Sequence, residues 1–239
     1  MEFIDLTLPS PEENLALDEA LLNGCDQETP KEILRFWQPE QYFVVLGYGC
    51  HHTADVILDA CAQDRISILR RMSGGGTVLQ GPGCLNFSLI TALSTGPDSR
   101  NITQTNHWIM QQHQAVFRSL LSQEVTVEGI TDLAINHLKF SGNAQRRGRY
   151  AALFHGSFLI NFDIAKISKY LQNPKRQPEY RHQRSHQDFL TNVSLNVQAI
   201  KNALQLNWGA YAPLSKIPLK EVERLVREKY SNHGWNLRI

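Results

Sequence analysis

The chain has 239 residues, of which 42% are hydrophobic and 20% charged, and its formal net charge is +1. These values are ordinary for a globular enzyme and give no sign of the basic face that nucleic-acid binding requires. No apolar run approaches the ~20 residues of a membrane span, and the polar, acidic N-terminus does not resemble a signal peptide. Four irregularly spaced cysteines without a CxxC pair favour reduced thiols in a cytoplasmic protein over disulfides or a zinc site.

The first third of the chain begins with a predicted helix and continues with short strands. Ser10-Pro11-Glu12-Glu13 combines a capping serine, a proline in the first helical position and a glutamate three residues after the cap. The helix is expected to end at Asn23-Gly24. Beyond it, the pattern predicts strands at 33–37, 42–46 and 66–69, with a turn joining the first two, and a helix at 54–63.

The rest of the chain alternates predicted strands and helices. Strands are expected at 86–92, 124–128, 132–135, 137–145 and 150–161. Helices are expected at 103–121, 163–171, 197–206 and 218–230, with a turn at Gly96-Pro97-Asp98 and a polar, basic loop at 173–188. This mixture predicts an α/β (α+β) fold, in which helices pack on a mixed sheet within a single domain spanning residues 1–239.

The strongest chemical signal is the stretch RRMSGGGTVLQGPGCLNFS at 70–88. Its three consecutive glycines have no Cβ, so the backbone there can adopt φ > 0 and approach a ligand closely. Amides without a ladder partner, beside the guanidinium groups of Arg70 and Arg71, form a site for phosphate or carboxylate oxygens. The alternative interpretation is a glycine-rich turn with two solvated arginines.

A second pair of stretches extends this signal. LKFSGNAQR at 138–146 is followed by HGSFLINFD at 155–163. With the glycine-rich stretch, they resemble the lipoate–protein ligase A family, within the wider biotin and lipoyl ligase superfamily. That family carries RRxSGGGxV, LNxS, KxSGxAxR and HGxLL in this order, and the resemblance runs from near residue 10 to the terminal WNLRI. It implies the class II biotin/lipoyl-ligase fold.

The resemblance implies an AMP-forming ligase that uses ATP and Mg²⁺. Lipoate or octanoate would be activated as an acyl-adenylate and then transferred to a lysine of a lipoyl carrier domain, from a 2-oxoacid dehydrogenase E2 or a glycine cleavage H protein. Lys139 is implied as the catalytic cation that contacts the carboxylate and the α-phosphate, which suits a compact ammonium group. Asp132 is a candidate magnesium ligand, although a capping aspartate explains it equally well.

The residues expected to bind ATP and the acyl chain fall within these motifs: Arg71, Ser73, Gly74, Gly75, Gly76, Thr77, Val78, Leu79, Asn86, Lys139, Ser141, Gly142, His155 and Gly156. Arg71 and the loop amides are expected to cradle phosphates, and Asn86 to orient the glycine-rich loop. Gly142 is expected to let the acyl chain pass close to the backbone. His155 and Gly156 are expected to line the acyl tunnel, although a buried, hydrogen-bonded histidine explains His155 at least as well.

Three other interpretations stay open. An octanoyltransferase of the same superfamily would need a cysteine nucleophile, which those enzymes place in the later half of the domain. All four cysteines here lie at or before Cys84, which favours the ligase. Cys84, close to the glycine-rich loop, stays a candidate nucleophile, and an apolar filler is its favoured interpretation. The chain stops where the family's catalytic domain ends, so a separate small accessory protein could complete an assembly that is inactive without it. A biotin ligase fits less well, because that group arranges its glycine motif as GRGRxG.

Overall fold

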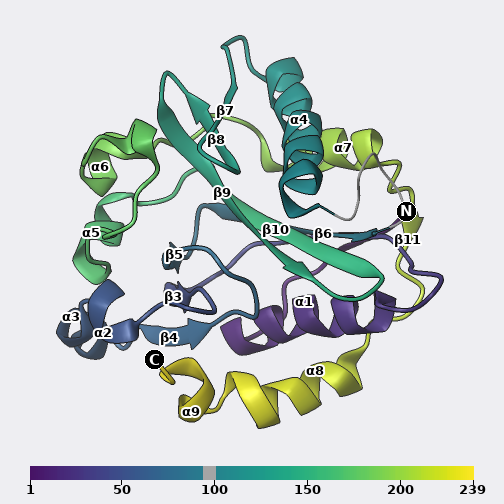
Figure 1. The fold of residues 1–239 in the computed structure, drawn as a ribbon, viewed down its shortest axis with the longest axis horizontal. Helices are drawn as coiled ribbons and strands as arrows, with labels where there is room; N and C mark the ends of the chain where they lie inside the picture. The colour runs from purple at the N-terminus through teal and green to yellow at the C-terminus, as the bar shows by residue number, and fades with distance from the viewer. Residues whose placement is uncertain (94–100) are drawn as a thin grey trace.

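An eight-stranded mixed sheet forms the centre of the fold, in the order β11-β1-β2-β6-β10-β9-β8-β7 (Figure 1). The computed structural model describes residues 1–93 and 101–239, and the turn expected at 96–98 lies outside them. β1 runs parallel to β2 and β11, and the other neighbours are antiparallel. The strands are β1 (Glu2–Asp5), β2 (Ile33–Trp37), β6 (Cys84–Ala92), β7 (Thr126–Glu128), β8 (Asp132–Ile135), β9 (Leu138–Arg147), β10 (Ala151–Leu159) and β11 (Ala212–Pro213).

A smaller sheet carries the glycine-rich loop. Its order is β4-β3-β5, with β3 (Phe43–Leu46) between β4 (Ser67–Arg70) and β5 (Val78–Gln80). The loop joins β4 to β5. The expectation that 33–37 and 42–46 are two strands joined by a turn is right about the strands, but β2 and β3 lie in different sheets. Both are fully buried, and the backbone groups of β2 are already paired with β1 and β6.

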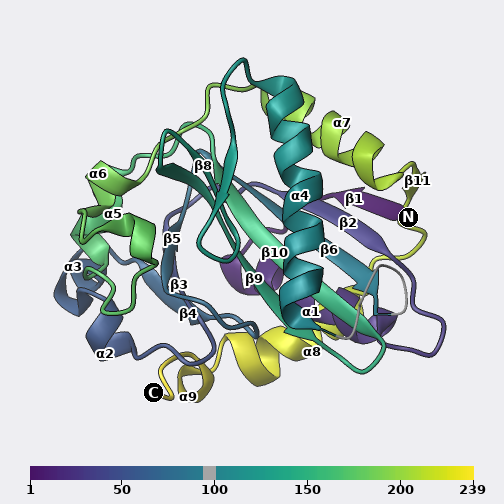
Figure 2. The same ribbon diagram turned by 45° about the horizontal axis from the view of Figure 1, so that its top comes forward.

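Helices cover both faces of the large sheet (Figures 1 and 2). One face packs against α1 (Pro11–Cys25), α8 (Leu219–Leu225) and the π-helical turn η2 (Val226–Tyr230) that continues it. The other packs against α4 (Ile102–Leu120) and α7 (Val197–Trp208). The short helices are α2 (His52–Asp55), α3 (Leu58–Gln63), α5 (Ala165–Tyr170), α6 (His186–Phe189), α9 (His233–Asn236) and the 3₁₀ turn η1 (Glu179–Arg181). The α/β expectation is confirmed.

The local signals explain where these helices begin and break. Ser10 accepts from the Glu13 amide while the Glu13 carboxylate accepts from the Ser10 amide, which is the expected capping box. The helix ends at Cys25, one residue beyond the expected Gly24. The helix expected at 54–63 is divided into α2 and α3, because Val56 forms a bridge with Leu171 instead of continuing the helix. None of the helices in the described ranges is long and apolar enough to cross a membrane.

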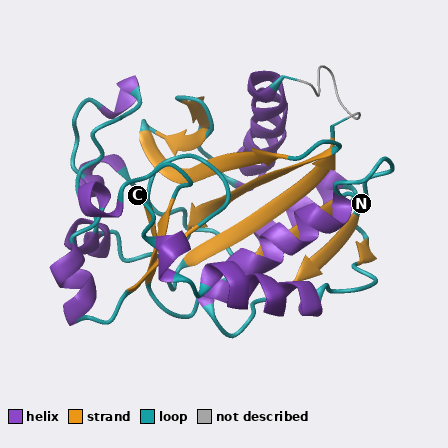
Figure 3. Ribbon diagram, turned by 60° about the horizontal axis from the view of Figure 1, so that its bottom comes forward, coloured by secondary structure: helices purple, strands orange, loops and turns teal. Residues whose placement is uncertain are grey.

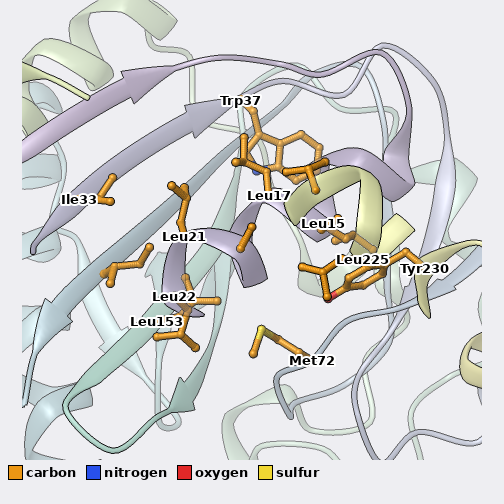
Figure 4. Close-up of a cluster of buried hydrophobic side chains, with 14 of the residues drawn as sticks. Leu15, Leu17, Leu21, Leu22, Ile33, Trp37, Met72, Leu153, Leu225 and Tyr230 are labelled. Carbon is orange, nitrogen blue, oxygen red and sulfur yellow. The ribbon is translucent and has the colours of Figure 1, made fainter. Parts of the chain in front are cut away.

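The face of the sheet under α1 changes character along its strands. Ile90 of β6 and Leu153 of β10 belong to one buried cluster with the leucines of α1. Figure 3 shows helices lying across the strands of the sheet, and Figure 4 shows Leu153 beside Leu22. Further along the same face, the residues two and four positions away are polar: Asn86, Ser88, His155 and Ser157. The opposite face stays apolar, with Phe87 and Phe154 packed toward α4. Because side chains alternate along a strand, the polar end of one face lies beside an otherwise apolar core.

Candidate active site

A cavity of about 1320 Å³ opens at this polar end of the sheet. The glycine-rich loop borders it on one side, and the β8–β9 hairpin borders it on another. Residues from both sequence motifs line it together: Arg71, Gly74, Gly75, Gly76, Thr77, Val78, Leu79, Asn86, Asp132, Lys139, Ser141, Gly142, His155 and Gly156. The remaining predicted residue, Ser73, is fully buried and contacts His155. The fold therefore brings the predicted set together.

The carbonyl groups of the glycine-rich loop are all anchored by the protein. The Ser73 carbonyl accepts from the Tyr48 amide at 2.8 Å. The carbonyls of Gly74 and Gly76 both accept from Nη2 of Arg71, at 2.5 and 2.9 Å. The Gly75 carbonyl accepts from the Cys50 thiol at 3.3 Å. Four successive peptide groups are thus held in fixed orientations.

The amides of the same peptide groups are free. In a trans peptide the N–H points opposite to the C=O, so anchoring these carbonyls turns the N–H groups of residues 74–77 the other way. Among the residues that the structure describes, none accepts a hydrogen bond from these four amides, and all four residues line the cavity. Four adjacent unpaired donors form a binding site for anionic oxygens.

Arg71 organises the loop rather than facing the cavity with a free guanidinium. Besides the two glycine carbonyls, it donates from Nε to the Ser73 hydroxyl at 3.1 Å. It is only 8% exposed, and burial lowers its pKa to about 10, so it stays charged at neutral pH. Its neighbour Arg70 is fully buried and donates to the carbonyls of Gly47, Tyr48 and Cys50. The expected phosphate contact of Arg71 therefore remains a prediction.

Only the middle glycine of the loop requires glycine. Gly75 has φ of +85°, and a Cβ on it would lie 2.8 Å from Nη2 of Arg71. Gly74 and Gly76 do not have positive φ, and a Cβ on either would meet nothing within 4 Å. Gly47, at the end of β3, is also required, because its Cβ would lie 2.0 Å from the Gly75 carbonyl oxygen. The sequence predicts an unusual backbone conformation across three consecutive glycines, and the structure has positive φ at only one of them, Gly75.

Lys139 and Asp132 form an ion pair on the β8–β9 hairpin. The Lys139 ammonium lies 2.8 Å from Oδ1 of Asp132, with the two side chains 25% and 13% exposed. Gly142 leaves room for it, because a Cβ there would lie 2.8 Å from Nζ of Lys139. The passage of an acyl chain beside Gly142 stays a prediction. An ammonium has three donors, so two remain for a ligand.

A buried chain of hydrogen bonds joins His155 to both motifs. Nε2 of His155 lies 2.6 Å from the Ser73 hydroxyl oxygen, and Nδ1 lies 3.1 Å from Oδ2 of Asp18. Because Nε of Arg71 can only donate, we assign the Ser73 proton to the bond with Nε2 and the imidazole proton to Nδ1. With its side chain only 12% exposed, His155 is a largely buried, hydrogen-bonded histidine close to the alternative interpretation, and it lines the cavity as well.

Asp18, on α1, is the last member of this series of hydrogen bonds. Its Oδ1 accepts from Arg35 at 2.6 Å and from the Ser88 hydroxyl at 2.7 Å. Burial alone would raise the pKa of Asp18, but the charge of Arg35 and the bonds from His155 and Ser88 outweigh it. The pKa therefore lies below its ordinary value of 3.8. The carboxylate stays ionised and fixes the imidazole orientation.

Asn86 does not contact the glycine-rich loop directly. Its amide donates to Oε1 of Gln80 at 3.0 Å, Gln80 donates to the Ser157 hydroxyl at 2.6 Å, and Ser157 donates back to Asn86. The three side chains form a closed ring on the cavity wall. The expectation that Asn86 orients the loop is thus met only indirectly, through Gln80 at the end of β5. Ser141 and Gly156 lie beside Asn143, whose Oδ1 would be 1.8 Å from a Cβ on Gly156.

Residues 173–190, called the cover segment below, supply another wall of the cavity. The sequence predicts a polar loop at 173–188, and the structure adds the short η1 and α6 helices to it. Arg184 binds the segment to the turn between β8 and β9, donating to the carbonyl of His137 at 3.0 Å. The Tyr180 hydroxyl donates to Oδ2 of Asp132 at 2.8 Å. The cover segment therefore contacts the hairpin that carries Lys139.

The four cysteines are free thiols with different access to the cavity. Cys84 is 2% exposed, and burial raises its pKa to about 12, so it carries no thiolate at neutral pH. Cys84 and Cys50 both line the cavity, and of the two Cys50 is the more exposed.

No group of three or more metal-binding side chains occurs within residues 1–93 and 101–239. Asp132 lines the cavity, and its oxygens contact Lys139 and Tyr180. One carboxylate facing a set of anion-binding amides fits the way Mg²⁺ is held, since that ion takes one or two carboxylates together with substrate phosphates. The role of Asp132 as a magnesium ligand stays a prediction.

Several residues of the site were not singled out by the sequence. Asp18, Gln80, Cys50 and Tyr180 lie far apart in the chain, and only the fold groups them. One feature of the sequence could have indicated Asp18, because it is an acidic residue within the apolar stretch NLALDEALL of a predicted helix. A buried carboxylate requires a partner, so that position indicates a charged group nearby.

Comparison with known proteins agrees with this geometry. The family described as lipoyl protein ligase A/B catalytic domain matches residues 10–206. The chain belongs to this family. A probable lipoate-protein ligase A of Mycoplasma genitalium is 27% identical over 99% of this chain and 72% of its own length. Lipoate-protein ligase A subunit 1 of Thermoplasma acidophilum is 27% identical over 94% of this chain and 91% of its own length.

The lipoyl protein ligase A/B family also contains a different activity. Octanoyltransferase LipM of Bacillus cereus is 22% identical over 95% of this chain and 94% of its own length. Belonging to this family therefore does not distinguish an ATP-dependent ligase from an acyltransferase.

Solved structures of the family share the fold. A bi-partite lipoate protein ligase, solved with its E2 lipoyl domain from Thermoplasma acidophilum, superimposes with a TM-score of 0.84 at 25% identity, covering 99% of this chain and 95% of that one. Lipoate-protein ligase A bound with ATP superimposes with a TM-score of 0.83 at 24% identity, covering 99% of both chains. The class II ligase-like fold is thus that of the family.

Proposed function

We propose that this chain is a lipoate–protein ligase, which activates lipoate or octanoate with ATP and transfers the acyl group to a lysine of a lipoyl carrier domain. The observation that carries the proposal is the row of four unpaired amides at 74–77, which shares a cavity with Lys139. Preorganised donors of this kind stabilise charge that develops on phosphate oxygens. The solved relative that binds ATP supports the choice of nucleotide.

In the first step, a carboxylate oxygen of the fatty acid attacks the α-phosphorus of ATP. A new P–O bond forms, the bond to the bridging oxygen of the pyrophosphate breaks, and pyrophosphate leaves. The amides at 74–77 bind phosphate oxygens, while Lys139 uses its two remaining donors on the carboxylate and the α-phosphate. Bound Mg²⁺, held by Asp132 and the phosphates, would neutralise phosphate charge.

In the second step, the carrier lysine attacks the acyl carbonyl carbon and loses a proton as the amide forms. The bond between the carbonyl carbon and the phosphate oxygen breaks, and AMP leaves. Apolar residues at the α1 end of the cavity, including Leu15, Trp37 and Val45, suit the aliphatic chain. Each buried CH₂ contributes about 0.8 kcal/mol to binding.

The cysteine route has less support in this chain. A thioester intermediate needs a thiolate, and the pKa of Cys84 is raised to about 12 by burial. Cys50 borders the cavity, but its thiol is occupied as a donor to the Gly75 carbonyl. The octanoyltransferase therefore ranks second.

The reactive adenylate needs a cover that excludes water, and two groups can provide it. The cover segment lines the cavity within this chain. The bi-partite relative instead suggests a separate small accessory protein. If the cover segment alone excludes water from the adenylate, the lone chain will lipoylate a carrier domain from free lipoate and ATP. Synthetic lipoyl-AMP will then increase the rate of lipoylation only slightly.

The deciding experiment compares three donors with the purified chain and a carrier domain: lipoate with ATP and Mg²⁺, synthetic lipoyl-AMP, and octanoyl-acyl carrier protein. We expect carrier lipoylation with lipoyl-AMP, and formation of lipoyl-AMP by mass spectrometry when ATP is supplied. Transfer from lipoyl-AMP without activation would indicate a required accessory protein. Failure with the first two donors, together with transfer from octanoyl-acyl carrier protein, would replace the ligase with the transferase.

A further inference from the structure

The carboxylate of Asp132 is shared between two groups that come from separate parts of the chain. Oδ1 lies 2.8 Å from the Lys139 ammonium, and Oδ2 accepts from the Tyr180 hydroxyl at the same distance. Asp132 and Lys139 face each other across the β8–β9 hairpin, whereas Tyr180 belongs to the cover segment. The sequence motifs that identify Lys139 give no role to Tyr180.

Tyr180 reaches Asp132 from a rigid turn. His182 and Gln183, which follow it, both have positive φ, of 50° and 60°. Arg184 closes the turn by donating to the carbonyls of Tyr180 and Arg181, at 2.8 and 3.1 Å. Non-glycine residues with positive φ cost free energy, so two in succession persist only where surrounding contacts hold them. The Tyr180 ring itself packs against the Phe189 ring, with 5.1 Å between the ring centroids.

The same turn is fastened to the hairpin at a second point. Arg184 donates to the carbonyl of His137 at 3.0 Å, in the turn between β8 and β9. Gly129 lies on the other side of the segment: a Cβ there would be in ordinary contact with Pro178 at 3.4 Å and with Tyr180 at 3.6 Å, so the segment packs directly against this position. Docking of the cover segment therefore brings the Tyr180 hydroxyl to Asp132 whenever these contacts form.

We propose that Tyr180 is a positioning residue that couples docking of the cover segment to the placement of Lys139. The hydroxyl holds Oδ2 of Asp132, so Oδ1 is aimed at the Lys139 ammonium, and the remaining two ammonium donors point to fixed places in the cavity. The same contact between Tyr180 and Asp132 therefore accompanies docking of the cover segment and alignment of the Lys139 ammonium.

This inference rests on the proposed function, because it takes Lys139 as the catalytic cation. The test compares Tyr180→Phe with Tyr211→Phe, a matched loss of a tyrosine hydroxyl at a side chain that is 66% exposed and does not line the cavity. Tyr180→Phe should lower kcat for lipoyl-AMP formation about tenfold, equivalent to ~1.4 kcal/mol, with KM for ATP within about twofold. In an Asp132→Asn background the same substitution should have no further effect, because Tyr180 acts through that carboxylate.

A second measurement does not depend on activity. Hydrogen–deuterium exchange of residues 173–190 should be about tenfold faster in Tyr180→Phe than in the parent, while exchange in α1 is unchanged. Equal exchange, or additive kinetic effects of Tyr180→Phe and Asp132→Asn, would overturn the coupling. If the parent neither forms lipoyl-AMP nor transfers the acyl group from it, the proposed function fails, and the exchange measurement still decides whether Tyr180 holds the cover segment on the hairpin.

Discussion

His155 and Ser73 meet at 2.6 Å, although 82 residues separate them in the chain. Each belongs to a different sequence motif, the HG pair of β10 and the start of the glycine-rich loop. Through Ser73, the histidine is connected to Arg71, which holds the loop carbonyls. The His155 side of the cavity and the glycine-rich loop are therefore linked by hydrogen bonds.

Lys139→Ala should leave the fold intact and reduce lipoyl-AMP formation by about 10²–10³-fold, which is the scale for losing one preorganised charge-stabilising group. Lys169→Ala is the control, because that lysine forms an ion pair with Asp64 on the surface and is 51% exposed. Adenylate formation is measured by mass spectrometry. Parental rates in the Lys139 variant would remove it from the mechanism.

Gly75→Ala and Gly74→Ala should behave differently although they are adjacent. At Gly75, φ is +85° and a Cβ would lie 2.8 Å from the buried Arg71, so the loop must distort. At Gly74 a Cβ meets nothing within 4 Å. We expect the thermal shift caused by ATP to be lost in Gly75→Ala and retained in Gly74→Ala. Equal responses to ATP would mean that loop geometry is not what binds the nucleotide.

Gly142→Ala tests the packing around the Lys139 ammonium. The added Cβ would lie 2.8 Å from Nζ and 2.9 Å from Cε, so Lys139 must move away from Asp132. A flexible lysine can move at little cost, and we therefore expect a small loss of stability with at least a tenfold loss of kcat. Gly24→Ala is the control: its Cβ meets nothing, and it should stabilise α1 by ~0.5–1 kcal/mol. Unchanged kcat in Gly142→Ala would contradict this account.

Asp18→Asn should destabilise the protein in a pH-dependent way. Removing one partner of a buried ion pair costs about 3–5 kcal/mol, because Arg35 is left uncompensated. The pKa of Asp18 is lower in the folded chain, so its contribution is complete above the unfolded value of ~3.9 and is lost as pH falls through the folded value. The gap in Tm between parent and variant should be constant above pH ~5 and shrink below pH ~4. Asp59→Asn, at an exposed position of α3, should show no such gap.

Cys84→Ser should keep most of the ligase activity, because the adenylate route needs no thiol. A modest loss of stability is expected, since a hydroxyl replaces a buried sulfur. Carrier lipoylation with ATP reports activity, and mass spectrometry of the parent reports any acyl-thioester. A trapped thioester on Cys84, with complete loss of transfer in the variant, would reverse the ranking of the two reactions.

The sequence by itself determined most of the elements and the identity of the site. Capping residues at Ser10–Glu13 and alternating apolar residues act over a few positions, so they predict a helix or strand without knowledge of the rest of the chain. The glycine-rich and KFSG motifs predicted a set of ligand-binding side chains, and the structure gathers almost all of them in the lining of one cavity. The strand β1 was not predicted, because four residues are too few to show a clear alternation of apolar and polar side chains.

The tertiary structure decided what each of these side chains does. The sequence predicts Arg71 as a phosphate ligand, yet its guanidinium binds two loop carbonyls. Together with the Tyr48 amide and the Cys50 thiol, which bind the other two, it turns four amides outward. Asp18 and Tyr180 join the site from an apolar helix and a polar segment, and neither carries a local signal of its partner. Hydrogen-bond partners distant in sequence are fixed only when strands pair and helices pack, because that packing sets the distances between them.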